Sequence, residues 1–468
     1  MIVTSLLLLV LVLLLLLVLV IVILLLEAVG VTRVQVQSTL FRVGIQIRTT
    51  VCGMEEDGGN QEGKGREEEG REGMKEREGR EEMEGRDDWE YRPEYSPETA
   101  ALLSAEFPQL RGQTYLDHAG ATLYSRSQVE DLSCHLLSSL HSNPHSSLAG
   151  AELVAEARSS LLAFLGPGAA EHYTVVFTAG ATAAIKLVGE VYPWGPGGLV
   201  LHEESHTSAV GLRELALAGG AGVRVEDDGG VEEWLAGDDL EGALLCYPAM
   251  SNYNGRKLPG AWVARAQGRG ARVLLDTAAW LATNPLDLAV ISPDFLVMSF
   301  YKMFGLPTGL GALVLRTSLA PELSKRYFGG GSVDMYLLRE NIQVARQELA
   351  ARLEDGTVHY LGIAALAPGL RALARVPGGM AAVARHTHGL ARLAYTRLTG
   401  LRHHNGRGVV RVHCEGDYGA LARQGGMLNF SLLDGEGGLV GHNTVARLAD
   451  MEGVVLRWGH WTDRILLE

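Results

Sequence analysis

Short apolar runs alternate with longer Ala/Leu-rich stretches between positions 114 and 316. Most of these runs consist mainly of Val, Leu, Ala and Phe, which is typical of buried strands, and most are separated by a segment long enough for a helix. This alternation favours an α/β fold with a largely parallel sheet covered by helices on both faces. The seven predicted strands span 174–177, 198–201, 223–226, 243–247, 271–275, 295–298 and 311–315.

The N-terminal stretch has a different pattern. Residues 2–26 form an almost unbroken Leu/Val/Ile run that is long enough to cross a bilayer as a helix. The first basic residues, Arg33 and Arg42, follow the run, and this bias would leave the rest of the chain on the cytoplasmic side. We therefore expect a cytoplasmic protein with a hydrophobic segment, 1–30, as its membrane anchor. The alternative is that this segment is foreign to the natural protein.

A charged repeat separates this segment from the apolar alternation. Residues 54–88 are almost entirely Glu, Gly, Arg and Lys and cannot bury enough surface to offset the entropy of ordering, so we predict a disordered linker within 31–113. We expect order to begin near Thr114. The pattern then predicts a large domain at 114–355 and a smaller α+β domain, incomplete, at 356–468.

Composition narrows the class of protein. The chain of 468 residues is long enough to bury a large core, and its net charge of -14 argues against a nucleic-acid-binding protein. The 4 cysteines, Cys52, Cys134, Cys246 and Cys414, are widely separated and show neither a disulfide pattern nor the spacing of a metal site. A reducing compartment and no bound metal are expected.

One lysine stands between two apolar runs. Lys302 follows the predicted strand 295–298, and Gly305, Gly309 and Gly311 follow it, allowing tight turns and close approach of the backbone. Apolar surroundings lower the pKa of a lysine, and the neutral amine is the form that attacks a carbonyl group. A surface lysine in a glycine-rich turn is the simpler interpretation of this position alone.

Polar residues also follow other predicted strands. The turn Thr178-Ala-Gly-Ala-Thr182 leads into an apolar helix, and free N–H groups at a helix start suit a phosphate, although an ordinary helix cap has the same pattern. His206 follows the next strand, where it could lie over an aromatic cofactor or simply cap a helix. Asp276 ends a very apolar strand, so it needs a cationic partner, either a pyridinium nitrogen or an arginine of the chain.

This ordered set resembles the class V aminotransferase and cysteine desulfurase family, and within it most closely the desulfurase-like domain of eukaryotic molybdenum cofactor sulfurases. The motifs that carry the resemblance are Tyr115-Leu-Asp-His-Ala-Gly-Ala-Thr122, Asn143-Pro-His-Ser-Ser147, Thr178 to Thr182, His206-Thr-Ser-Ala-Val-Gly211, Leu275-Asp-Thr-Ala-Ala279, Ser299-Phe-Tyr-Lys-Met-Phe-Gly305, Tyr327-Phe-Gly-Gly-Gly331 and Arg352-Leu-Glu-Asp-Gly-Thr357. The resemblance implies a fold-type I transferase that depends on pyridoxal 5′-phosphate (PLP).

The resemblance also implies a role for each residue. Lys302 would form the covalent link to PLP, Asp276 would pair with the ring nitrogen, and His206 would stack on the ring. The phosphate would be held by Ala181, Thr182 and Ser299, while Asn252 would reach the ring hydroxyl or the substrate. Gly356 and Thr357 match a pair that comes from a second subunit in this family, which implies a homodimer.

The chain departs from the family pattern at three places. Ala279 stands where desulfurases usually carry a glutamine, and Tyr301 stands where a histidine commonly precedes the lysine. The family motif Arg-x-Gly precedes a cysteine whose thiolate attacks the substrate sulfur, whereas Arg457-Trp-Gly is followed by His460 and by no cysteine. We expect structural roles for Cys134, Cys246 and Cys414.

The resulting functional hypothesis is L-cysteine desulfuration to alanine with sulfur transfer to the molybdenum cofactor, impaired in this chain because the loop cysteine and the C-terminal domain are missing. One alternative is another PLP-dependent lyase that acts on cysteine or a different amino acid. A second is a non-catalytic, membrane-tethered protein that pairs with a complete copy.

Overall fold

The computed structural model describes residues 90–237, 240–413 and 417–457. The expected anchor at 2–26 and the charged repeat at 54–88 lie outside these ranges, so the anchor, the disordered linker and the cytoplasmic location stay predictions. Within the described ranges, no helix is both long enough and apolar enough to cross a membrane.

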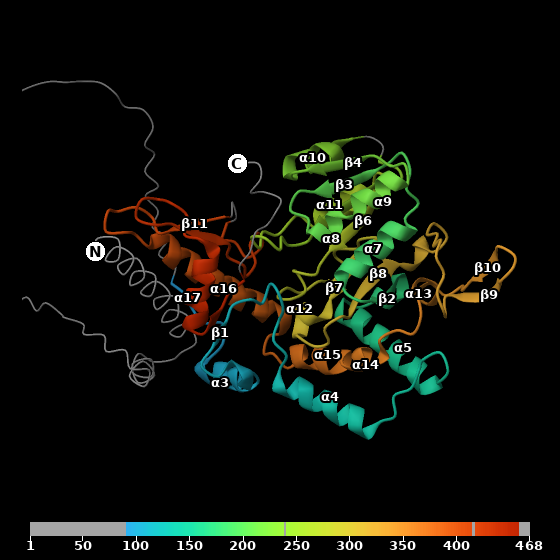
Figure 1. Cartoon of the computed structure of the whole chain (residues 1–468), viewed down its shortest axis with the longest axis horizontal. Coiled ribbons are helices and arrows are strands. Elements are labelled where there is room, and N and C mark those ends of the chain that lie inside the picture. The colour runs from blue at the N-terminus through green and yellow to red at the C-terminus, as the bar shows by residue number, and fades with distance from the viewer. Residues whose placement is uncertain (1–89, 238–239, 414–416, 458–468) are drawn as a thin grey trace, which may run out of the picture.

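A seven-stranded sheet forms the centre of the molecule (Figure 1). Its strands, in spatial order, are β2 (Tyr173–Thr178), β8 (Gly311–Arg316), β7 (Phe295–Ser299), β6 (Arg272–Asp276), β5 (Leu244–Pro248), β3 (Leu199–His202) and β4 (Val223–Glu226). All neighbours pair in parallel except β8, which runs antiparallel to both β2 and β7. The predicted strands and the mostly parallel sheet are therefore confirmed.

Apolar side chains on both faces of the sheet are covered by helices. On one face, Leu274 and Val297 belong to a buried cluster with residues of α7 (Ala181–Val191) and α9 (Leu212–Ala218). On the other face, the cover comes from α5 (Leu148–Phe164) over β2, β7 and β8, and from α10 (Asp228–Ala236) and α11 (Ala261–Gln267) over β3, β5 and β6. Because both faces are buried, the strands read as continuous apolar runs rather than alternating ones.

The remaining elements of the sheet domain lie around this core. They are α4 (Arg126–Ser138), α6 (Ala169–His172), α8 (Thr207–Val210), α12 (Phe300–Phe304), α13 (Leu349–Leu353), the short 3₁₀ helices η1 (Pro108–Leu110) and η2 (Thr317–Leu319), and a hairpin of β9 (Val333–Leu337) with β10 (Ile342–Ala345). The hairpin pairs only with itself and projects away from the body of the molecule (Figure 1).

The smaller domain is built from both ends of the described chain. Its elements are α3 (Pro97–Ala105), β1 (Thr114–Tyr115), α16 (Gly379–Gly400), β11 (Val410–Val412), β12 (Phe430–Leu432), α17 (His442–Met451) and β13 (Val454–Val455). Strand β1 pairs in parallel with β13, and β11 pairs antiparallel with β12. The expected α+β composition is therefore present.

Two predicted boundaries need correction: the start of order near Thr114 and the start of the smaller domain at 356. Order begins before Thr114, because α3 is folded and Glu94 forms an ion pair of 2.5 Å with Arg385 of α16. That ion pair joins positions far apart in the chain, so no local pattern in the sequence predicts it. At the other boundary, α14 (Tyr360–Ala364) and α15 (Leu366–Ala374) place Ile363 and Leu366 in the core of the sheet domain. The smaller domain therefore resumes at α16, not at 356.

The turn after Lys302 packs against the backbone of residues 122–124. Gly305 has a φ of 78°, and a Cβ atom added there would lie 2.6 Å from the carbonyl carbon of Leu123 and 2.7 Å from the carbonyl oxygen of Thr122. The backbone N–H of Thr122 also donates to the carbonyl of Tyr301 at 3.1 Å. Glycine is required here because the two backbones touch.

Replacing Gly305 tests this packing. We expect Gly305→Ala to lower the free energy of unfolding by about 3 kcal/mol, because it combines an unfavourable φ with a backbone clash. Gly309→Ala is the matched control: its φ of 67° is similar, but nothing lies within 4 Å of an added Cβ, so about 1 kcal/mol is expected. Urea denaturation measures both, and equal losses would contradict the packing argument.

Candidate functional site

The carboxyl ends of three neighbouring parallel strands bring the candidate residues together. Asp276 ends β6, Ser299 ends β7 and is followed by α12 with Lys302, and the turn with Asn252 follows β5. Pro248 of β5 pairs with Asp276, which in turn pairs with Val297 of β7. Ligands of open α/β sheets bind at this edge, so the register of the strands places the site.

Lys302 is partly buried at this edge. Its Nζ donates a hydrogen bond of 3.0 Å to Oδ1 of Asn252. Burial lowers the pKa of Lys302, and the nearby Asp276 carboxylate opposes part of that effect. The surface-lysine interpretation is therefore wrong, and a neutral amine is accessible to this residue at a lower pH than for a lysine in water.

Asp276 is only 8% exposed. Its Oδ1 accepts a hydrogen bond of 2.9 Å from the backbone N–H of Ala278. Burial raises the pKa of Asp276, while that hydrogen bond and the positive charges of Lys302 and His206 act in the opposite direction. No arginine of the described residues forms an ion pair with Asp276, so the arginine alternative is not supported.

His206 is both a helix cap and a neighbour of this pair. Its Nδ1 accepts a hydrogen bond of 3.1 Å from the backbone N–H of Ser208, at the start of α8. The neutral ring consequently carries its proton on Nε2. Burial lowers the pKa of His206, and the charges of Asp276 and Lys302 both act on it, which places the imidazole near both residues. The two predictions for His206, a helix cap and a residue that lies over an aromatic cofactor, are therefore compatible.

The predicted phosphate turn lies at the start of α7. The backbone N–H of Ala181 donates to Oγ of Ser299 at 2.9 Å, and Oγ1 of Thr182 lies 2.7 Å from Oγ of Ser208. Gly180 has a φ of 138°, and a Cβ atom on Gly311 would lie 2.6 Å from the Cα of Gly180. Two glycines thus allow the turn to lie against β8, with hydroxyl and N–H groups grouped at a helix N-terminus.

Asn252 supplies an independent sign of a ligand. Its Nδ2 is buried and has no hydrogen-bond partner in the described part of the chain. A buried donor without an acceptor is costly, so such a group usually faces a ligand or water. A bound PLP would offer a ring oxygen to Nδ2 of Asn252, a phosphate to the N–H and hydroxyl groups of the turn, and a protonated ring nitrogen to the Asp276 carboxylate. These residues therefore fit PLP.

Gly356 and Thr357 are not brought into this cluster. The Gly356 carbonyl lies 3.2 Å from Nε2 of His145, and Nδ2 of Asn143 donates to Oγ1 of Thr357 at 3.2 Å. Neither Gly356 nor Thr357 lines the cavity beside Lys302. Within one copy of the chain, these two residues therefore do not complete the site.

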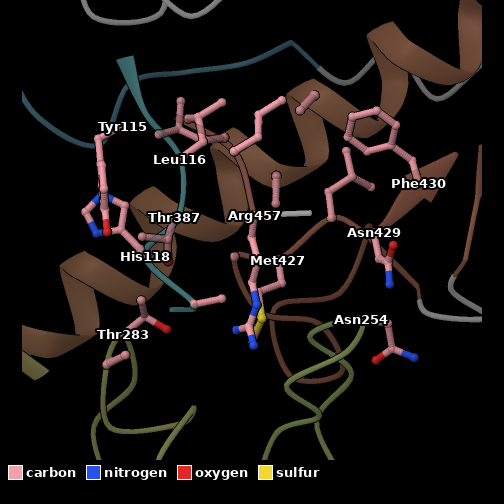
Figure 2. Close-up of a pocket in the computed structure, with 18 of the residues that line it drawn as sticks. Tyr115, Leu116, His118, Asn254, Thr283, Thr387, Met427, Asn429, Phe430 and Arg457 are labelled. Carbon is pink, nitrogen blue, oxygen red and sulfur yellow. The ribbon is translucent and has the colours of Figure 1, made fainter. Parts of the chain in front are cut away.

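A large cavity of about 2330 Å³ opens beside Lys302 and Asn252, between the two domains. Figure 2 shows Arg457 inside it, between His118, which follows β1 in the chain, and Phe430 of β12. The charge of Arg457 lowers the pKa of Lys302 and that of Asp117 raises it. Sequence reasoning missed both electrostatic roles, although both residues belong to quoted motifs, because their distance to Lys302 depends on how the domains meet.

Comparison with known proteins identifies the family. The family model for class V aminotransferases matches residues 114–467. The chain belongs to this family. The residues of the site fit the cofactor of the family, and the prediction of PLP is confirmed.

The chain is also similar to curated molybdenum cofactor sulfurases, which confirms the resemblance seen in the motifs. It is 40% identical to the protein from Homo sapiens over 393 residues, which is 78% of this chain and 44% of the relative. Identity to the protein from Danio rerio is 38% over 394 residues, or 78% of this chain and 47% of the relative. The chain thus spans about half the length of the curated relatives it matches.

Solved cysteine desulfurases share the fold. The apo cysteine desulfurase of Thermococcus onnurineus NA1 superposes with a TM-score of 0.63 at 21% identity, covering 75% of this chain and 85% of that one. The cysteine desulfurase CsdA of Escherichia coli gives 0.61 at 22% identity, covering 76% and 87%. These similarities confirm the fold-type I architecture.

Of the two described cysteines, Cys246 is poorly placed for sulfur chemistry. Cys246 lies within β5 and is fully buried, and burial raises the pKa of its thiol far above the usual range. Cys134 is exposed on α4. Cys52 and Cys414 lie outside the described residues. A thiol whose thiolate form is suppressed is a weak nucleophile, which supports a structural role for Cys246.

Ser299 offers a test of the phosphate turn. We expect Ser299→Ala to weaken PLP binding about tenfold or more, because one hydrogen bond to a charged group is lost. Thr317→Ala is the control, since its Oγ1 bonds the carbonyl of His172 beyond the opposite end of β8 and should leave affinity unchanged. Spectroscopic titration with PLP measures both, and equal affinity in the two variants would contradict the assignment.

Proposed function

We propose that this protein is a PLP-dependent enzyme of the molybdenum cofactor sulfurase type that binds L-cysteine and acts on its C–S bond. The observation that carries the proposal is the cluster of Lys302, Asn252, Asp276 and His206 at one sheet edge, in a chain 40% identical to the human sulfurase over 393 residues. The desulfurase-like activity and the substrate come from these relatives and are proposals for this chain.

The residues divide the chemistry between them. Bound PLP supplies an electron sink for bonds at the α and β carbons of an amino acid. Asp276 would hold a proton on the ring nitrogen, and the His206 ring would support the cofactor face. The Nζ of Lys302, made less basic by burial, can accept a proton from the α carbon of a bound amino acid. Asn252 would orient that amine through its Oδ1.

Sulfur transfer is the step that we propose to be impaired. The family uses a cysteine thiolate directly after its Arg-x-Gly motif, and in this sequence His460 stands directly after Arg457-Trp-Gly. Cys246 cannot substitute because its thiol is fully buried in β5. We therefore propose that this chain transfers sulfur to a molybdenum cofactor only when another thiol takes the place of the loop cysteine and accepts the sulfur first.

A homodimer is part of the proposal. Gly356 and Thr357 do not line the cavity beside Lys302 of their own chain, and they lie close to an exposed hairpin, since Gly356 N–H donates to the carbonyl of Gly330 at 2.7 Å. The hairpin carries large apolar side chains that are mostly exposed, including Tyr336, Leu338 and Ile342. Exposed apolar surface of this kind favours a protein partner, and a second copy is the partner that would also place Gly356 and Thr357.

Absorbance spectroscopy tests the enzymatic proposal. Purified protein with added PLP should show a visible cofactor band that Lys302→Ala abolishes and that L-cysteine shifts. Alanine together with persulfide would indicate that the C–S bond is cleaved and that a thiol accepts the sulfur, while a shifted band without either product would support impairment. Release of pyruvate and sulfide would instead favour a lyase. The absence of any Lys302-dependent band would overturn the proposal in favour of a non-catalytic protein.

The dimer proposal has a separate test. We expect the wild-type chain to run as a dimer in light-scattering chromatography, and the double substitution Tyr336→Asp/Ile342→Asp to shift it to a monomer, because charges at a buried interface are unfavourable. Val290→Asp is the control, since Val290 is 79% exposed elsewhere on the surface and should not change the mass. A dimer that survives the hairpin substitutions would place the interface elsewhere.

A further inference from the structure

One buried carboxylate fastens the turn that carries Asn252. Oε2 of Glu204 accepts a hydrogen bond of 2.6 Å from Oγ of Ser251, and Oε1 accepts one of 3.3 Å from Nδ2 of Asn254. These two partners stand on either side of Asn252 and Tyr253 in the chain. Glu204 is 8% exposed, Ser251 is fully buried and Asn254 is 4% exposed, so these bonds are largely shielded from water.

Hydrogen bonds within the turn also define its shape. Oγ of Ser251 accepts hydrogen bonds from the backbone N–H groups of Tyr253 at 3.2 Å and Asn254 at 3.4 Å, and therefore shapes the turn from within. Oδ1 of Asn254 accepts from the N–H of Arg256 at 2.9 Å. Glu204 bonds both side chains that shape the turn, so its carboxylate sets where the turn stands relative to β3.

Glu204 also belongs to a network of charged and polar side chains. Arg256 lies 3.8 Å from Oε1 of Glu204 and donates to Asp228 at 2.5 Å. Asp228 also lies 2.9 Å from Nε2 of the buried His202, whose Nδ1 accepts from the backbone N–H of Glu204 at 3.1 Å. Arg256 compensates the charge of Glu204, and the network keeps the carboxylate in place.

We propose that Glu204 is a positioning residue for Lys302, acting through the turn 251–254 and the Oδ1 of Asn252. This inference deepens the proposed function. Its geometry is that of the protein without cofactor, but the benefit of positioning Lys302 rests on the proposed function. Asn252 Oδ1 accepts from Nζ of Lys302 at 3.0 Å. A side chain that is held in place accepts this bond without further loss of entropy, whereas a free turn would let the acceptor drift.

The sign of the effect follows from hydrogen bonding. An acceptor at 3.0 Å from Nζ favours the ammonium form of Lys302, so loss of that acceptor lowers the pKa of the amine. The other charged groups that act on Lys302 are Asp276, Asp117 and Arg457. Replacing Glu204 by glutamine separates the effect of the position of Asn252 from the effect of the Glu204 charge.

The test reads the amine directly, in the full chain without cofactor. The rate of acetylation of Lys302 by acetic anhydride is followed against pH by mass spectrometry, with the exposed Lys186 as internal reference. Asn252→Leu should lower the midpoint for Lys302 by about one pH unit, because a hydrogen bond to a charged group is lost. Glu204→Leu should lower it in the same direction, and the double variant should match Asn252→Leu.

Glu204→Gln is the matched variant, because it keeps the size and an acceptor for Asn254 but removes the charge. Its midpoint should stay near the wild-type value. Additive shifts in the double variant, an unchanged midpoint in Glu204→Leu, or an equal shift in Glu204→Gln would each overturn the positioning role. If Glu204→Leu does not fold, Ser251→Ala interrupts the same connection from the turn and should shift the midpoint in the same direction.

Failure of the proposed function is separable from failure of this inference. A wild-type protein without a Lys302-dependent PLP band would remove the cofactor assignment, yet the acetylation midpoints would still report whether Glu204 positions Asn252. Conversely, a normal PLP band together with additive midpoint shifts in the Asn252→Leu/Glu204→Leu double variant would support the cofactor assignment and reject the role of Glu204.

Discussion

The electrostatic attraction between Lys302 and Asp276 at the edge of the sheet is the interaction on which the rest of the site depends. Burial lowers the pKa of the amine and raises that of the carboxyl, and each group partly restores the charge of the other. Either charge buried alone would be strongly unfavourable. Because β6 and β7 are parallel neighbours, they end at the same edge and deliver both groups together.

Such a site is sustained by the extent of the core around it. Three apolar clusters cover the two faces of the sheet, and the strands behind Asp276 and Ser299 are almost fully buried. Close backbone contacts at Gly305 and Gly311 leave no room for side chains. A rigid scaffold allows polar groups to be held in a functional arrangement that does not maximise stability.

The turn with Asn252 also connects the two domains. Gln424 donates to the carbonyl of Asn254 at 2.7 Å, and the N–H of Gly425 donates to the carbonyl of Gly255 at 2.8 Å. Glu204 holds this turn on the side of the large domain. Both domains thus hold the turn that carries Oδ1 of Asn252, the acceptor for Lys302. A relative movement of the domains would therefore change the position of this acceptor.

The sequence alone determined the strands, the α/β class and the family, and it singled out Lys302, Asp276, His206 and the turn 178–182 as candidate site residues. These features are local, since apolar runs and the residues that follow them are contiguous in the chain. Only the tertiary structure decided that Glu94 folds onto α16, that α14 and α15 belong to the large domain, and that Glu204 and Arg457 face the site. Each of these depends on contacts between distant segments, and a single sequence carries no local pattern for such contacts.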